Sequence, residues 1–253
     1  MSQFLSKEFI KRLINDVKYI KKNPLDTNGI YYLHDENDLM TGYALIIGPK
    51  NTVYENGYYF FKFNFTPQYP HEPPIVKYMT NGGNVRFNPN LYTDGKVCIS
   101  LLNTWSGEQW TSCQNISSIL LSLCTLLNDN PLLNEPNVQS DDENIQNYNT
   151  LLEYANFDIG ICDVVNIDSH LHCSETKFIS LFVDVYIEHF INNYQNHICK
   201  IEKLIQNCDT KSKMKTIYIP FYEYKGNINY KTLLRKMKET YNLISNKKYN
   251  LKK

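Results

Sequence analysis

The chain has 253 residues, more than the ~100–200 typical of one domain, so its length predicts a core domain with a substantial extension or a second small domain. Hydrophobic residues make up 42% and charged residues 21%, a balance that excludes an intrinsically disordered chain. The 26 basic residues equal the 26 acidic residues, so net charge gives no basis for binding nucleic acid or an anionic membrane.

Neither targeting nor metal binding is indicated by the sequence. Acidic residues interrupt the lysines of the first segment, which has no continuous apolar run, and the apolar stretch 116–127 is too short to span a bilayer. Seven cysteines form no CxxC pair, and Cys173 follows His170 and His172 without distant partners, so we expect neither a disulfide framework nor a metal site. These features predict a cytoplasmic and/or nuclear protein.

The first 80 residues change from helical to strand periodicity. Residues 6–23 carry apolar side chains at helical spacing, with Ser6 as the N-cap and Pro24 as the stop. Four segments rich in aromatic and branched residues then alternate with turns, at 29–34, 41–47, 58–65 and 75–78, which predicts an antiparallel meander. The odd-numbered residues from Tyr59 to Phe65 are all aromatic, so that face should pack inward.

No regular element is predicted between residue 79 and residue 115, although this interval is too apolar to be disordered. Long irregular segments of compact domains are usually functional. Beyond it, the pattern predicts helices at 115–127, 143–165, 175–207 and 230–244, with one extended strand at 215–224.

Cys98 lies inside the irregular interval, between a turn and an apolar run. At a rim its thiol would be accessible on one side and available as a nucleophile, whereas the alternative is a small buried hydrophobe. Asn90 precedes it by eight positions in a loop held by Pro89, enough chain to fold back and aim an amide at a developing oxyanion. One well-placed donor of that kind is worth about 10²–10³ in rate.

The order of these motifs resembles the ubiquitin-conjugating enzymes. The family's meander is matched by GPKNTVYENGYYFFKFNFTPQYPHEPP at 48–74, its active-site segment by FNPNLYTDGKVCISLL at 87–102, and its tryptophan and crossing helix by QWTSCQNISSILLSL at 109–123. The TWSGEQW insertion, at 104–110, and NPLLNEP, at 130–136, resemble the large Z-type members. NYNTLLEYANFDIGICDVV, at 147–165, and INYKTLLRKM, at 228–237, extend that resemblance toward the C-terminus.

The resemblance implies an α+β fold of the ubiquitin-conjugating type. Its parts would be an N-terminal helix, a four-stranded antiparallel meander, an active-site loop and a crossing helix in residues 1–165. A mostly helical extension, residues 166–253, would pack on this core.

The resemblance also implies a mechanism. Cys98 would accept ubiquitin or a ubiquitin-like modifier as a thioester from an activating enzyme, and a substrate lysine would then attack with the help of a ligase. Asn90 would support the loop and stabilise the oxyanion, while Asn88 and Pro89 shape the loop, with Asn88 where most relatives have histidine. No cofactor would be bound directly, since the activating enzyme consumes ATP upstream.

An acidic residue near the cysteine orients the attacking lysine in this family. Glu135 aligns best with that position, Asp129 is the rival, and a loop carboxylate without this role is the alternative for either. Asp94, beside Gly95, is expected to form a turn.

Partner contacts are implied as well. Lys7, Lys11 and Arg12 of the first helix would meet acidic surfaces of the activating enzyme, against the plainer interpretation of a solvated face. Ligases would contact the loop that carries His71 and the loop at Trp110. Because residues 110–113 read Trp-Thr-Ser-Cys where many relatives have Trp-Ser-Pro-Ala, common ligase preferences do not transfer.

Two competing interpretations differ from this one. A non-catalytic adaptor of the same fold would bind ubiquitin without transferring it, but such relatives lack the active cysteine. A cysteine hydrolase would need a histidine base, and no motif ties His170, His172, His189 or His197 to Cys98.

Overall fold

The computed structural model describes residues 5–166, 176–207 and 214–250. Its helices and strands, in chain order, are α1 Lys7–Lys22, β1 Ile30–His34, β2 Thr41–Ile47, β3 Tyr58–Asn64, β4 Ile75–Tyr78, α2 Ile116–Leu126, α3 Asn144–Ala155, α5 Val183–Asn207, β5 Lys215–Ile219, β6 Tyr224–Ile228 and α6 Tyr230–Asn250. Short helical turns are η1 Asp26–Asn28, η2 Ser100–Leu102, η3 Pro131–Asn134, η5 Lys177–Phe182 and η6 Pro220–Tyr222, and α3 continues as the π-helical segment η4 Asn156–Asp163. The chain is therefore an α+β protein, as the sequence predicts.

Helix α1 begins and ends where the sequence indicates. The Ser6 hydroxyl accepts a hydrogen bond from the backbone N–H of Phe9, which satisfies one of the free donors of the first turn. The buried side chains include Phe9, Leu13 and Ile20, spaced on one face of the helix.

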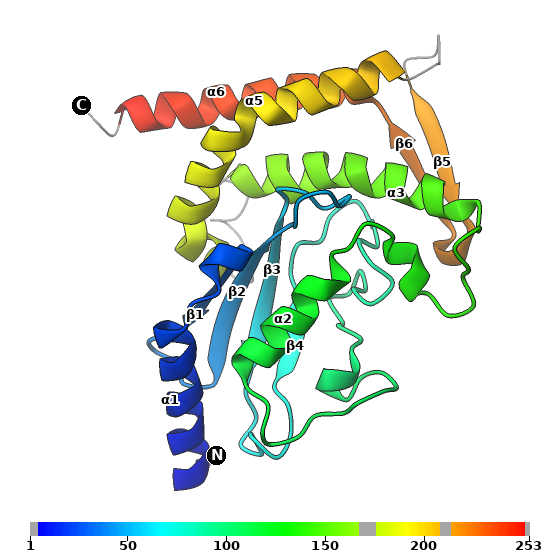
Figure 1. The fold of residues 1–253 in the computed structure, drawn as a ribbon. Helices are drawn as coiled ribbons and strands as arrows, with labels where there is room; N and C mark the ends of the chain where they lie inside the picture. The colour runs from blue at the N-terminus through cyan, green and yellow to red at the C-terminus, as the bar shows by residue number, and fades with distance from the viewer. Residues whose placement is uncertain (1–4, 167–175, 208–213, 251–253) are drawn as a thin grey trace.

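The four predicted strands form one antiparallel sheet in the order β1-β2-β3-β4. Leu45 pairs with Phe60, and Phe63 pairs with Val76, which fixes the register on either side of the central strand β3. The predicted meander is confirmed, and β4 is left as the edge strand nearest to the irregular interval (Figure 1).

Strand β3 is buried on both faces, although its sequence predicts one inward face. Tyr59, Phe61 and Phe63 are buried as expected, and Tyr58 and Phe60 are also fully buried. The reason is the C-terminal part of the chain, which covers the second face of the sheet. The Phe60 ring lies 6.1 Å from that of Phe178 and 5.9 Å from that of Phe182, both in η5, and 6.2 Å from that of Tyr186 in α5.

Helix α2 crosses the sheet on the side opposite to α5 (Figure 1). Asn115 and Ser118 form a capping box at its start, each side chain bonding the other's backbone N–H. The irregular interval before it contains the isolated bridge of Leu91 with Val97 and the turn η2, and a bridge of Lys96 with Lys77 joins it to β4.

The π-helical segment that follows α3 ties the C-terminal part to the sheet. Asn156, buried at its first position, accepts a hydrogen bond from the Tyr59 hydroxyl at 2.6 Å and donates to the carbonyl of Glu55 at 2.9 Å. A Cβ on Gly57 would lie 1.9 Å from the Asn156 side-chain oxygen, so the turn before β3 requires glycine for this approach.

The predicted strand at 215–224 is wrong in part, since the segment forms one arm and the tip of a hairpin. Strand β5 ends at Ile219, and Pro220 and the positive φ of Glu223 turn the chain into β6. Figure 1 shows this hairpin beside α3, with α5 and α6 running together above them.

Other differences concern the ends of elements. The predicted helix at 175–207 starts as the tighter turn η5, and α6 continues past residue 244 to Asn250. The run from His170 to Cys173 lies outside the described residues, and so does the first part of the extension expected at 166–253, whose boundary stays a prediction. Among the described helices, none is long and apolar enough to cross a bilayer.

Candidate active site

Cys98 follows Val97, which bridges to Leu91 across the candidate loop. Its backbone N–H donates to the carbonyl of Asn90 at 2.9 Å. Only 2% of the residue is exposed, so the structure places it as a buried thiol and not at an open rim. Yet among the described residues it stands outside the contiguous apolar core, to which Cys162 belongs. Cys98 is therefore buried beside the core without being part of it.

The Asn90 side chain completes the pair with Cys98. Its Nδ2 donates to the Cys98 carbonyl at 2.6 Å, and its own backbone N–H donates to Oδ1 of Asn88 at 2.9 Å. The structure thus brings together Cys98, Asn90 and Asn88, as the sequence predicts. Two reciprocal hydrogen bonds across the loop fix the cysteine backbone more firmly than one would.

Asn88 connects this loop to the crossing helix. It is fully buried, and its Nδ2 donates to the Leu126 carbonyl at 2.8 Å and to the Tyr54 hydroxyl at 3.2 Å. Burial raises the pKa of Tyr54 well above its ordinary value, so this hydroxyl stays protonated and donates to the Phe87 carbonyl at 2.5 Å. An asparagine can therefore serve here as a loop-structural residue, and Pro89 beside it accepts a hydrogen bond from the Arg86 guanidinium.

Thr104 secures the loop from the side of the insertion. Its hydroxyl donates to the Val97 carbonyl at 2.8 Å and accepts from the Ile99 N–H at 3.0 Å, so the residues on both sides of Cys98 are held. Trp105, next along the insertion, is 41% exposed. Sequence reasoning missed Thr104, since its contacts depend on how the insertion folds back.

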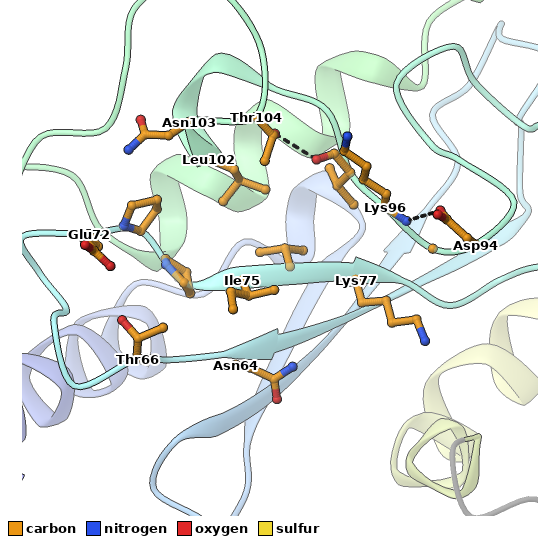
Figure 2. Close-up of a pocket in the computed structure, with 15 residues that line it drawn as sticks. Asn64, Thr66, Glu72, Ile75, Lys77, Asp94, Lys96, Leu102, Asn103 and Thr104 are labelled. Carbon is orange, nitrogen blue, oxygen red and sulfur yellow. Dashed lines mark hydrogen bonds between the residues drawn. The ribbon is translucent and has the colours of Figure 1, made fainter. Parts of the chain in front are cut away.

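A groove of about 670 Å³ flanks this segment (Figure 2). Ile75 and Lys77 of β4 line one wall, and Lys96, Leu102 and Thr104 line the other. Glu72 and Pro73 close one end, so the groove joins the loop beside His71 to the segment around Cys98.

The two candidate acids lie in different surroundings. Glu135 ends η3 and accepts a hydrogen bond on Oε2 from the Tyr222 hydroxyl at 2.8 Å. Its neighbour Asn134 donates to Oδ1 of Asn88 at 3.5 Å, so Glu135 lies close to the candidate loop. Asp129 lines a separate polar hollow that also contains Lys200. Asp94 accepts from the Lys96 N–H at 2.9 Å, the turn geometry expected of it.

The three cationic residues predicted to bind an activating enzyme differ in exposure. Lys7 and Lys11 are exposed, whereas Arg12 is engaged within the chain. Its Nε lies 2.8 Å from Asp16 Oδ2, and its terminal nitrogens donate to the carbonyls of Ser112 and Gln114, both at 2.5 Å. Arg12 thus joins α1 to the segment before α2.

His71 and Trp110, predicted to meet ligases, also differ. His71 is exposed, with its Nε2 3.5 Å from Glu8 Oε1. Trp110 is only 7% exposed, and its indole N–H donates to the Pro70 carbonyl at 2.7 Å. Trp110 therefore holds the two expected ligase loops together, and the exposed groups are those of its neighbours.

The described histidines after Cys98 have other contacts. His189 shares a hydrogen bond with the Tyr58 hydroxyl at 3.1 Å, and His197 packs against Phe157 and Phe190. Both belong to the packing of α5 on the rest of the molecule, so neither supports a hydrolase arrangement. Among the described residues, no group of three His, Cys, Asp or Glu side chains could hold a metal ion.

Comparison with known proteins identifies the family. The family model of the ubiquitin-conjugating enzyme matches residues 12–155. The chain is 34% identical to Ubiquitin-conjugating enzyme E2 Z of Danio rerio over 236 residues, 92% of this chain and 68% of that protein. Identity to the E2 Z of Homo sapiens is 34% over 229 residues, 89% of this chain and 61% of that protein. The solved structure of human Ubiquitin-conjugating enzyme E2 G1 is 32% identical and covers 46% of this chain and 90% of its own, with a TM-score of 0.40.

The family model and the identity to the E2 Z enzymes define the class of protein: a transferase that works through a thioester intermediate. The chain belongs to the ubiquitin-conjugating enzyme family. Its similarity over most of its length is to the E2 Z type, as the sequence motifs predict. In general terms, its partners are those of the family: ubiquitin, an activating enzyme and a ligase.

Proposed function

We propose that Cys98 is the residue that carries ubiquitin or a ubiquitin-like modifier as a thioester, with no cofactor bound directly and ATP consumed upstream. The reciprocal hydrogen bonds between Cys98 and Asn90 carry this proposal. They support it because they fix the backbone from which the thiol projects while leaving its sulfur unengaged by either bond.

Charging is an exchange of thioesters. The Cys98 thiolate attacks the modifier's terminal carbonyl, the new sulfur–carbon bond forms, and the activating enzyme's cysteine leaves as a thiolate. Since one thiolate replaces another, no dedicated base is required. The absence of a histidine beside Cys98 in the sequence motif is compatible with this chemistry.

Discharge to lysine, unlike charging, requires the site to stabilise a developing oxyanion. The lysine amine attacks the thioester carbonyl, whose oxygen gains negative charge before the Cys98 thiolate leaves. One N–H of the Asn90 amide is used on the Cys98 carbonyl. The second remains to donate to the oxyanion, a role that preorganised amides perform effectively.

We assign lysine orientation to Glu135 in preference to Asp129. Glu135 follows Asn134, which touches the loop of Asn88, whereas Asp129 faces the hollow near Lys200. A carboxylate beside the thioester accepts a hydrogen bond from the incoming amine, which orients the amine and replaces one of its hydrogen bonds to water.

We assign partner contacts to the predicted residues that are exposed, and supporting roles to those that are buried. Lys7 and Lys11 would meet acidic groups of the activating enzyme, and Arg12 would support that surface by fixing α1. His71 would contact the ligase, with Trp110 holding the loops beneath it. No recognition of nucleic acid or membrane is proposed.

The decisive experiment is charging with ATP, ubiquitin or a related modifier and a panel of activating enzymes. We expect an adduct that reductant removes, and Cys98→Ser should give an adduct that resists reductant, because an ester replaces the thioester. Cys113→Ser is the matched control, since Cys113 is an exposed thiol whose loss should leave charging unchanged. A reductant-sensitive adduct on Cys98→Ser would refute Cys98 as the thioester residue. If no combination of modifier and activating enzyme gave an adduct, a non-catalytic adaptor would be favoured.

A further inference from the structure

The tip of the C-terminal hairpin reaches the candidate active site. Tyr222, half-buried in η6, lies with its ring centroid 5.7 Å from that of Tyr148 and makes two further contacts there. Its hydroxyl donates to Glu135 Oε2 at 2.8 Å, and its ring centroid lies 4.7 Å from the guanidinium carbon of Arg86. One side chain from the extension thus touches two segments that flank the Cys98 loop.

Arg86 links Tyr222 to the loop that carries Asn90. Its guanidinium lies between two aromatic rings, 3.9 Å from the centroid of Tyr92 and 4.7 Å from that of Tyr222. It also donates to the Pro89 carbonyl, and its own carbonyl accepts from the Tyr148 hydroxyl at 2.6 Å. A guanidinium stacked between rings is well fixed, because cation–π attraction adds to its hydrogen bonds.

The first contact restrains the carboxylate. Glu135 is held through its backbone N–H, which donates to the Leu132 carbonyl at 2.9 Å, and through Oε2, which accepts from Tyr222. Within the described ranges no group donates to Oε1, so one oxygen is fixed and the other is left for an incoming donor.

The Tyr222 hydroxyl remains a donor under ordinary conditions. Burial, followed by the hydrogen bond and charge of Glu135, raises its pKa well above the ordinary value. The hydroxyl is therefore protonated at any pH at which conjugation would be assayed, and the bond to the carboxylate is charge-assisted.

We propose that Tyr222 is a positioning residue for lysine discharge: its hydroxyl holds the Glu135 carboxylate through Oε2, which leaves Oε1 for the incoming amine, while its ring packs on Arg86 beside the loop. This inference rests on the proposed function, in which Cys98 carries the modifier and Glu135 orients the lysine. The C-terminal extension thereby contributes to the reaction and does not only pack on the core.

The step concerned is aminolysis of the thioester. The neutral lysine nitrogen forms a bond to the thioester carbonyl carbon, the bond from that carbon to the Cys98 sulfur breaks, and the thiolate leaves. The amine's surplus proton passes to solvent, while Oε1 accepts a hydrogen bond from the amine and so fixes its line of approach. Transfer to a small thiol needs no such guidance, since the attacking thiolate carries no hydrogen.

The test compares Tyr222→Phe with the unmodified chain in single-turnover discharge. Charging should be unchanged, discharge to free lysine should fall about tenfold, as for loss of a hydrogen bond to a charged group, and discharge to 2-mercaptoethanesulfonate should be unchanged. Tyr218→Phe is the matched control, because Tyr218 lies on the same hairpin with 53% exposure, and it should discharge at the unmodified rate.

A second measurement asks whether Tyr222 acts through Glu135. Glu135→Gln should itself slow discharge to lysine, and adding Tyr222→Phe to that variant should slow it no further, since contacting residues are non-additive. Independent, multiplying effects would overturn the proposal.

The outcomes separate the two proposals. If the unmodified chain charges on Cys98 and Tyr222→Phe discharges to lysine at the same rate, the role of Tyr222 is refuted and the role of Cys98 stands. Equal slowing toward lysine and thiol would also refute it, because that result indicates a general loosening of the loop. If charging does not depend on Cys98, the proposed function fails, and the role of Tyr222 fails with it.

Discussion

Asn90 and Cys98 hold each other across the loop, and the side chain of Asn90 is the part that a substitution can remove cleanly. We expect Asn90→Ala to charge near the normal rate, because thioester exchange does not depend on the amide. Discharge to lysine should fall about 10²-fold, the usual cost of one lost oxyanion donor. Single-turnover discharge of the purified thioester measures this.

Asn90→Asp serves as the companion variant for this prediction. It keeps the shape of the side chain but replaces the amide donors with oxygen, which would face the Cys98 carbonyl now 2.6 Å from Nδ2. It should be at least as slow as Asn90→Ala. Undiminished discharge in both variants would remove Asn90 from the reaction.

At the scale of single residues, the sequence predicts contacts between residues that are close together in the chain. The motif from Asn88 to Cys98 folds into one loop, so its residues could be placed together from their order. The contacts of Arg12 with Ser112 and Gln114, and of Tyr222 with Glu135, join positions about ninety or more apart in the chain. Nothing in the neighbouring residues indicates such pairs, so the sequence alone places Arg12 at a partner surface and gives no signal for the contact of Tyr222 with Glu135.

Strand β3 shows the same limit for whole elements. Its alternation predicts one buried face correctly, but the burial of Tyr58 and Phe60 depends on η5 and α5, which lie more than a hundred residues later. The sequence does not reveal the hairpin, because only Pro220 and Glu223 interrupt an otherwise continuous run of strand formers. The periodicity of the sequence therefore predicts where helices and strands lie, but tertiary packing determines which of their faces are buried.

The aromatic contact between η5 and the sheet gives a test at this scale. Phe178 stacks on Tyr43 with ring centroids 4.6 Å apart and meets Phe60 edge-on. Phe178→Ala should lower the free energy of unfolding by about 3 kcal/mol through lost burial and the cavity left behind. Urea unfolding followed by tryptophan fluorescence measures the change.

Leu181→Ala is the control for Phe178→Ala. Leu181 lies in the same turn but is 56% exposed, so its truncation should change stability by about 0.5 kcal/mol or less. Equal effects of the two substitutions would show that η5 does not draw its stability from the face of the sheet.

The molecule as a whole is held together by contacts between the extension and the core that are not all apolar. Lys200 of α5 lies 3.5 Å from Glu55 and 3.2 Å from Glu153, and Lys236 of α6 pairs with Asp158 and Asp163 of the π-helical segment. These pairs are partly exposed and contribute modestly. His197, in the same helix as Lys200, is only 2% exposed.

His197 makes the docking of α5 dependent on pH. Burial, followed by the charges of His189 and Lys200, lowers the pKa of His197 to about 4. Its ring lies 6.1 Å from Phe190 and 5.8 Å from Phe157, and within the described part of the chain its buried Nε2 has no hydrogen-bond partner. The native state therefore keeps the imidazole neutral, since a proton there would be desolvated beside a lysine.

The sign of the effect follows from the two protonation states. Between pH 6.5 and about 4 the unfolded chain binds a proton at this position and the native chain does not, so stability falls as the pH falls through that window. Above pH 6.5 neither state is protonated, and the contribution is constant. From pH 7 to pH 5 the loss due to His197 should be about 2 kcal/mol.

Comparison with His197→Phe isolates this contribution from the carboxylates that also titrate on acidification. A phenyl ring fits the same apolar site between Phe157 and Phe190 and carries no titratable group. Urea unfolding of both proteins at pH 7 and pH 5 should show that the variant loses about 2 kcal/mol less than the unmodified chain. Parallel losses in the two proteins would mean that His197 is protonated equally in the native and unfolded states, and that the seam between extension and core does not respond to pH at this residue.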